Sequence, residues 1–177
     1  MDLISVVVLK ALHIGCIPGF SGQQQQIILA KEEDAEVTAS RIANFAHPEY
    51  PELEDFGDAQ LTGKNGSAGY FRLDWFTPDG LRTWGDGRMF IQGTEGFIEV
   101  RKYVNIASDK DGGGHVFVVN GKGEQYLNAA GVTGYPFFGQ LILDCLNRTE
   151  KAMTQAHAFK AAELCLRAQE KAVVIAP

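Results

Sequence analysis

Cysteine is scarce in this chain, and its spacing excludes several classes of protein. The 177 residues include three cysteines, Cys16, Cys145 and Cys165. An odd set without a Cys-x-x-Cys spacing argues against a disulfide framework, a zinc site or a dithiol redox site. Cys145 and Cys165 fall in apolar stretches of helical period, where a free thiol acts as a small hydrophobic side chain. We therefore expect a reducing, cytoplasmic location.

The sequence also lacks a long hydrophobic run and an excess of positive charge. Residues 3–9 are mostly apolar, but Lys10 follows them, so the run is too short to span a bilayer. Asp2 stands where a secretory signal carries positive charge, and a lipid anchor at Cys16 is the alternative to a buried strand. Sixteen Lys+Arg against 22 Asp+Glu give a net charge of -6. We expect neither a nucleic-acid nor a membrane partner.

Motifs for nucleotide, metal and nucleophile chemistry are missing as well. Residues 85–87 (Gly-Asp-Gly) lack the third glycine of a dinucleotide fingerprint, and residues 112–114 (Gly-Gly-Gly) lack the Lys-Ser/Thr of a P-loop. No His-Glu-x-x-His and no Gly-x-Ser-x-Gly occurs. The sequence therefore predicts no catalytic residue, no cofactor-binding residue and no metal ligand in this chain.

What is present is an ordinary globular composition that is rich in glycine. The chain is 45% hydrophobic and 21% charged, and its length suits one domain. Twenty glycines indicate many tight turns, and hence hairpins. Strands are predicted at residues 35–45, 56–62, 68–76, 89–92, 97–101, 115–119 and 124–127. The Asn-Gly pair at 65–66 is typical of a hairpin turn between the second and third of these.

Alternation along two of these strands predicts which side chains share a face. In the first strand, Val37, Ala39, Arg41, Ala43 and Phe45 fall on one side. In the third strand, Phe71, Leu73 and Trp75 lie opposite Tyr70, Arg72 and Asp74.

The last forty residues change from a period of two to a helical period. Pro136 suits the first turn of one helix, and Thr154 can cap a second. The first helix repeats Phe138, Leu141, Ile142, Cys145 and Leu146 at helical spacing. The inner stripe of the second is predicted from Phe159, Ala162, Leu166 and Val173, with Cys165 and Ala172 beside them.

Strands followed by helices predict an α+β fold, with an open, mostly antiparallel β-sheet and C-terminal helices packed on one face. We divide the chain into an atypical N-terminal segment, 1–33, and the α+β domain, 34–177. The segment 1–33 reads as an apolar strand or helix followed by a glutamine-rich break.

Five side chains form the candidate ligand site. They are Arg72, Asp74, Trp84, Asp86 and Arg88. Alternate strand residues lie about 7 Å apart on one face, a spacing that suits different hydroxyls of one polar ligand. A tryptophan beside acids and arginines is typical of sugar binding, so a sugar-like small molecule is one expected partner. The competing interpretation is a set of surface ion pairs with a structural tryptophan.

A second copy of the chain is the other expected partner. Tyr70, Phe76, Phe90 and Phe97 do not all fit on the side of the sheet that the helices cover. An apolar open face needs a cover. We therefore expect a homo-oligomer that forms through the open sheet face.

Two stretches carry a resemblance to a known family. Residues 93–100 (Gly-Thr-Glu-Gly-Phe-Ile-Glu-Val) and the helical segment 138–172 resemble the C-terminal domain of the Gfo/Idh/MocA oxidoreductases, the relatives of glucose–fructose oxidoreductase and inositol dehydrogenase. The strand 70–76 and the segment 83–88 fit the same pattern, so the resemblance covers most of residues 34–172.

The resemblance implies that the open sheet supplies the substrate side of an active site and the subunit interface. In that family a preceding Rossmann domain binds NAD or NADP, a Glu-Lys-Pro lysine assists catalysis, and a Gly-Gly…Asp…His helix handles the proton. None of these motifs occurs in this chain, so no proton-transfer residue can be assigned to it. The cofactor is implied for full-length members only.

Two functions are therefore compatible with the sequence. The first is the substrate-side and oligomerisation domain of an NAD(P)-dependent sugar or polyol oxidoreductase, truncated and inactive alone. The second is a non-catalytic β-sheet module for dimerisation or ligand binding.

Overall fold

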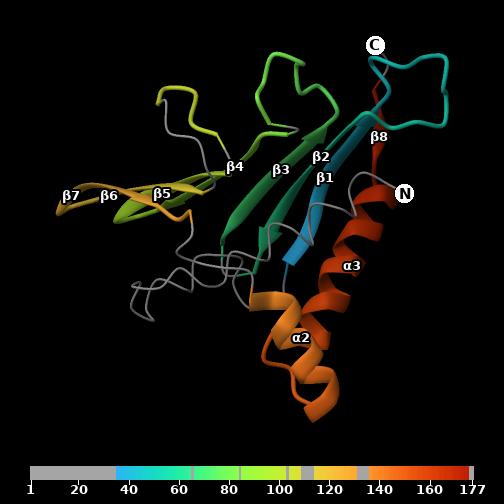
Figure 1. Cartoon of the computed structure of the whole chain (residues 1–177). Coiled ribbons are helices and arrows are strands. Elements are labelled where there is room, and N and C mark those ends of the chain that lie inside the picture. The colour runs from blue at the N-terminus through green and yellow to red at the C-terminus, as the bar shows by residue number, and fades with distance from the viewer. Residues whose placement is uncertain are drawn as a thin grey trace. The chain divides into compact units, whose positions relative to one another are not determined.

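A computed structural model describes residues 35–64, 66–83, 85–102, 104–108, 114–130 and 136–175. Its strands are β1 (Ala35–Ala43), β2 (Phe56–Gly63), β3 (Ala68–Asp74), β4 (Gly87–Gly93), β5 (Gly96–Lys102), β6 (His115–Asn120), β7 (Gly123–Asn128) and β8 (Val173–Val174), and its helices are α2 (Pro136–Asn147) and α3 (Gln155–Glu170) (Figure 1). The predicted α+β class is confirmed. The N-terminal segment 1–33 lies outside the described residues.

The described residues divide into two compact units, which we treat separately. The first comprises 35–76 and 136–175, and the second comprises the described residues of 77–130. Each unit contains one four-stranded sheet. The strands predicted for a single sheet are thus shared between two.

The sheet of the first unit has the order β3-β2-β1-β8. The pairs β1–β2 and β2–β3 are antiparallel, whereas β8 joins β1 in parallel. At the β2–β3 turn, Gly66 has a φ of 82° and donates its N–H to the Gly63 carbonyl at 2.9 Å. A positive φ is the reason the turn contains a glycine, as predicted from the sequence.

A β-bulge in β1 changes which of its side chains share a face. The register with β2 shifts between Val37 and Ala39. Val37 is buried before the bulge, but Ser40 is buried after it, and Arg41 is exposed. The prediction that Val37, Ala39 and Arg41 share one side is therefore wrong, because the extra residue of a bulge reverses the alternation.

Helix α3 covers one face of this sheet with small side chains (Figure 1). The core consists of Leu164, Cys165 and Ala168 on α3 packed with Ala35, Val37, Ala59 and Leu61 on the strands, and Ala161 on α3 is also buried. Thr154 caps the helix as predicted, since its Oγ accepts the His157 N–H at 3.2 Å.

The predicted inner stripe of α3 is wrong apart from the neighbouring Cys165. Phe159, Leu166 and Val173 are exposed, and the buried stripe lies on another side of the helix. Small residues occupy most of the buried side of α3, because alanine and cysteine allow the helix to approach the sheet closely.

Helix α2 buries one of its residues, Asp144. Both carboxylate oxygens of Asp144 hold the α2–α3 linker: Oδ1 accepts the Thr149 hydroxyl at 2.6 Å, and Oδ2 accepts the Ala152 N–H at 2.7 Å. The hydrogen bond from Thr149, together with the backbone N–H groups of Ala152 and Lys151, lowers the pKa of Asp144 to about 2. A charged carboxylate, rather than apolar burial, therefore fastens the end of α2 to the linker.

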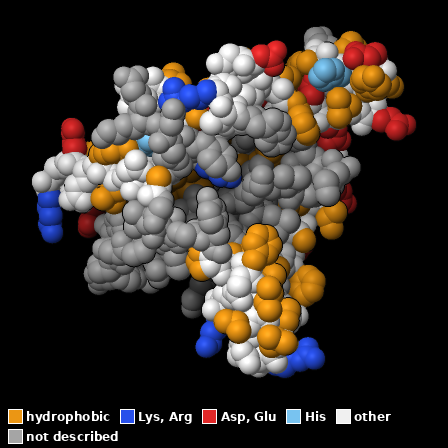
Figure 2. Space-filling model, in the orientation of Figure 1, with side chains coloured by type: hydrophobic (Ala, Val, Ile, Leu, Met, Phe, Trp, Pro, Cys, Tyr) orange, Lys and Arg blue, Asp and Glu red, His pale blue; other side chains and the backbone are white. Residues whose placement is uncertain are grey.

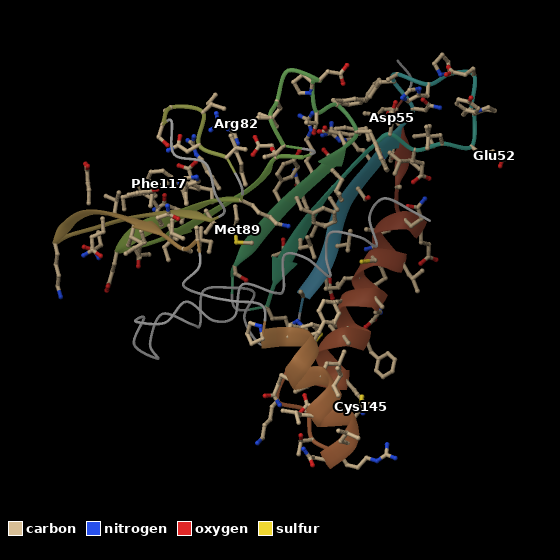
Figure 3. All side chains as sticks on the ribbon, in the orientation of Figure 1. Glu52, Asp55, Arg82, Met89, Phe117 and Cys145 are labelled. Carbon is tan, nitrogen blue, oxygen red and sulfur yellow. The ribbon has the colours of Figure 1, made fainter. Side chains whose placement is uncertain are left out.

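The second unit is an antiparallel meander in the order β4-β5-β6-β7. Gly96 closes its first hairpin, within the segment that resembles the oxidoreductase family. A Cβ on Gly96 would lie 2.1 Å from the carbonyl oxygen of Val119, so no larger residue fits there. Figure 3 labels Met89 and Phe117, which come from the two opposite faces of this sheet. Val116 and Val118, on the face of Met89, are buried.

Candidate functional site

The predicted ligand-site residues fall into two ion pairs, one in each unit. Arg72 donates to Asp74 at 2.7 Å on β3, and the Nε of Arg88 donates to Asp86 at 2.9 Å beside the start of β4. The structure thus brings together the members of each pair. Trp84, the fifth predicted residue, lies outside the described residues.

In the first unit, Arg72 belongs to a row of charges across the open face of the sheet. The strand register places Arg41 of β1 and Arg72 of β3 directly opposite Asp58 of β2. The Nε of Arg41 donates to Asp58 Oδ1 at 3.0 Å, and its terminal nitrogen forms a second, shorter contact with Oδ2. The Tyr70 hydroxyl donates to Oδ2 at 3.2 Å. We call Arg41, Asp58, Tyr70 and Arg72 the charged row.

The charged row keeps Asp58 ionised. Hydrogen bonding from Arg41 lowers the pKa of Asp58, against the opposing effect of burial. The same contact raises the pKa of Arg41, and burial, followed by the Asp58 charge, raises the pKa of Tyr70. A buried carboxylate with a lowered pKa is a poor proton acceptor at neutral pH, so Asp58 suits positioning rather than general base catalysis.

The two arginines of the charged row remain open to solvent. Their side chains are 53% and 52% exposed, for Arg41 and Arg72 respectively. A shallow hollow of about 260 Å³ adjoins Tyr70 of the same row, with Thr38 and Gln60 also in its lining. Arg41 is held by the buried Asp58 and Arg72 by Asp74. Exposed guanidinium groups that are held in place can bind the oxygens of a polar ligand or of a second protein surface.

In the second unit, Asp86 and Arg88 adjoin a surface of charges and aromatic rings. Arg88 lies opposite Arg101 in the strand register, and Arg101 donates to Glu99 at 2.6 Å. Hydrogen bonding with Asp86, aided by the more distant charge of Glu99, raises the pKa of Arg88.

Aromatic rings extend this surface over β4–β7. The guanidinium of Arg101 lies 5.6 Å from the ring centre of Phe117, which in turn lies 5.3 Å from that of Tyr126. Phe90 shares the face and is exposed. Exposed rings beside paired charges are compatible with the stacking and hydroxyl binding that a sugar needs.

A buried histidine lies at the edge of the same surface. His115 is fully buried, and its Nδ1 is 2.8 Å from the Tyr126 hydroxyl. Its Nε2 has no hydrogen-bond partner within the described residues. His115 therefore packs beside Tyr126 on the same face of the sheet, and its imidazole is closed to solvent.

Sequence reasoning missed Arg41, Asp58, Glu99 and Arg101. Asp58 was detectable as a lone charge between small residues inside a strand. Arg41 was assigned to the wrong face because the bulge in β1 has no clear sequence signal. Glu99 and Arg101 alternate along β5, which places them on one face.

Within the described ranges, no group of three His, Cys, Asp or Glu side chains is arranged to hold a metal ion. None of the helices within them has the length and apolarity needed to cross a lipid bilayer.

The chain is similar to oxidoreductases of known structure. No protein-family model and no curated protein matches it. A provisionally assigned oxidoreductase from Erwinia carotovora atroseptica is 52% identical, with a TM-score of 0.78, over 85% of this chain and 45% of its own. A provisionally assigned oxidoreductase from Thermotoga maritima is 20% identical, with a TM-score of 0.62, over 78% of this chain and 37% of its own.

A third similar structure is the 3-ketoreductase KijD10 from Actinomadura kijaniata, solved with TDP-benzene and NADP. It is 12% identical, with a TM-score of 0.61, over 99% of this chain and 48% of its own. The two more distant similarities establish the fold alone. The chain spans less than half the length of each of these three proteins.

Proposed function

We propose that this chain is the substrate-side and oligomerisation domain of an NAD(P)-dependent sugar or polyol oxidoreductase of the Gfo/Idh/MocA type, and that it is inactive alone. The observation that carries the proposal is the match to the Erwinia oxidoreductase, with 52% identity confined to 45% of that protein. More than half of that relative has no counterpart in this chain. This chain has no dinucleotide fingerprint of its own.

The substrate-side role is supported by two surfaces that carry paired charges. Arg72 and Asp74 lie on one, and Asp86 and Arg88 lie on the other. Each pair combines an exposed donor with an acceptor, which is what a polyhydroxylated ligand requires. KijD10, a structural neighbour, was solved with NADP and TDP-benzene. Trp84 stays a predicted substrate-binding residue.

The oligomerisation role is supported by the open face of the first sheet. Tyr70 is 59% exposed there, beside the half-exposed arginines of the charged row. An amphipathic aromatic among arginines is typical of the centre of a protein interface. We propose that a second copy of the chain covers this face.

A chimera tests the proposed function. The N-terminal half of the Erwinia oxidoreductase is fused ahead of residue 35 and assayed with NAD and NADP against a panel of aldoses, polyols and inositols. We expect turnover by the chimera, and none by the full chain or the N-terminal half alone. Turnover by the isolated chain would overturn the inactivity claim, and a folded but inactive chimera would contradict the substrate-side role.

Variants of the chimera then assign the substrate contacts. Arg72→Ala and Arg88→Ala should each raise KM about tenfold if its side chain binds substrate hydroxyls. Arg167→Ala is the matched control, because Arg167 is equally exposed but pairs with Glu163 on α3, outside both charged surfaces. An unchanged KM in both ligand-site variants would favour the competing interpretation of surface ion pairs.

The alternative function is a non-catalytic dimerisation or binding module. The internally satisfied charged row favours it, because Asp58 and its partners form a stable polar surface without any cofactor. Sedimentation of the full chain at micromolar concentration, followed by titration with sugars, separates the two. A dimer that binds no sugar and yields no active chimera would favour this module.

A further inference from the structure

Apolar side chains are exposed along both C-terminal helices. We define the helix-hairpin face as Phe138, Leu141, Ile142, Cys145 and Leu146 on α2 with Phe159, Ala162 and Leu166 on α3. All eight are exposed. Figure 2 shows hydrophobic side chains gathered over the part of the molecule where these helices lie.

The solvent-exposed surface of α2 carries no charged side chain. Asp144 is the single charged residue between Pro136 and Asn147, and it is buried against the linker. A helix that faces solvent normally exposes charged and polar residues. In α2 the charged residue is buried, whereas the leucines and the isoleucine are exposed. This arrangement indicates that another protein surface packs on the helix.

The spacing of the helix-hairpin face suits a helical or similarly ridged partner. On α2 the residues of this face recur at i, i+3, i+4, i+7 and i+8 from Phe138, which gives one continuous stripe over two turns, and Leu143 beside the stripe is exposed as well. Phe138 and Leu146, at its two ends, are 72% and 74% exposed. A stripe of this kind packs ridges into the grooves of another element.

We infer that the helix-hairpin face is the docking surface for the cofactor-binding half of the oxidoreductase. This inference rests on the proposed function. The length of the relatives favours this occupant, since more than half of the Erwinia protein has no counterpart in this chain. A second copy is the weaker choice, because the charged row already offers a polar face for self-association.

Cys145 lies within this face and provides a direct probe of it (Figure 3). In a Cys16→Ser chain, Cys145 is exposed and Cys165 is buried, so a maleimide should label Cys145 rapidly and Cys165 slowly. Labelling of each cysteine is followed by peptide mass mapping. It is compared among the chain alone, the chain mixed with the N-terminal half of the Erwinia protein, and the chimera.

The cofactor-binding half should slow the labelling of Cys145 by at least about tenfold, because a docked surface excludes the reagent. Unchanged labelling in both the mixture and an active chimera would overturn the docking surface and leave the proposed function standing. Protection in an inactive chimera would support docking while the proposed function fails. Protection that rises with the concentration of the chain alone, together with a dimer mass, would assign the face to a second copy instead.

Two charged variants and a matched control sharpen the result. Ile142→Glu and Leu166→Glu place a carboxylate on the exposed face and should restore Cys145 labelling in the mixture to the rate of the chain alone. Ile106→Glu is equally exposed but lies in the second unit, and it should leave the protection intact. Equal protection in all three variants would contradict the inference, provided that circular dichroism shows that each is folded.

Discussion

Helix α3 carries two apolar stripes that meet different surroundings. Leu164 belongs to the stripe packed on the sheet and is 6% exposed, whereas Leu166, two residues later, is 66% exposed. Both stripes recur at helical spacing, so periodicity alone does not distinguish them. The difference shows that a helical hydrophobic pattern predicts a face that needs to be covered. The covering surface can belong either to the same unit, as for Leu164, or to something outside it, as we infer for Leu166.

The largest expected effect comes from the covered stripe. Leu164→Ala removes a side chain from the core formed with Val37, Ala59 and Leu61, and should lower the free energy of unfolding by about 2–5 kcal/mol. Urea denaturation measures the change. A loss below about 1 kcal/mol would mean that α3 does not pack on the sheet as described.

The next effect concerns the carboxylate that holds α2. Asp144→Asn should lower Tm, because it removes the charge that accepts hydrogen bonds from Thr149 and Ala152. The pKa of Asp144 is lowered from 3.8 to about 2, so its contribution is present above pH 3.8 and is lost as the pH falls toward 2.

The wild-type chain should therefore lose stability relative to Asp144→Asn across that window, as followed by thermal melts at stepped pH. A Gln140→Ala control removes a longer contact to the same carboxylate and should have a smaller effect. Parallel melting curves for wild type and Asp144→Asn between pH 2 and 4 would contradict this account.

A smaller effect is expected on the open face of the same sheet. Asp58→Asn weakens the contact with Arg41, but solvent around the half-exposed arginine limits the cost to the order of 1 kcal/mol. Since hydrogen bonding from Arg41 lowers the pKa of Asp58, this contribution is also lost as the pH falls below 3.8. Added salt should reduce the difference between wild type and variant, and a salt-independent difference would count against an electrostatic origin.

The smallest effect should come from the exposed stripe of α3. Leu166→Ala in the chain alone should change the free energy of unfolding by less than about 0.5 kcal/mol, because the side chain is not part of the core. It is the matched control for Leu164→Ala, with the same chemistry on the same helix. Equal losses in the two variants would erase the distinction between the stripes.

Most of the fold was predictable from the sequence. The seven predicted strands correspond to β1–β7, and Pro136 and Thr154 stand at the predicted starts of α2 and α3. Turn glycines, proline and a helix cap act on the backbone within a few residues, so their effects can be predicted without knowledge of tertiary contacts. The division of the strands between two sheets depends on long-range pairing, which no local pattern contains.

The candidate site was less predictable than the fold. Arg72 with Asp74, and Asp86 with Arg88, proved to be neighbouring ion pairs. Arg41 was missed because the bulge between Val37 and Ala39 reverses the faces of β1, whereas Asp58 was detectable as a lone charge inside β2. A bulge is set by the pairing of two strands, so alternation along one strand cannot report it.

The parallel strand β8 has a consequence for the solubility of the first unit. It pairs with β1 through Arg41 and Ile42 alone, and the Lys171 ammonium group binds the Val37 carbonyl at 2.7 Å. The outer edge of the sheet is thus two residues long and flanked by a lysine, while the opposite edge, β3, exposes Arg72. A short edge strand is a poor template for adding strands from other molecules, so β8 disfavours growth of the sheet at that edge, while at the longer β3 edge the charge of Arg72 acts in the same direction.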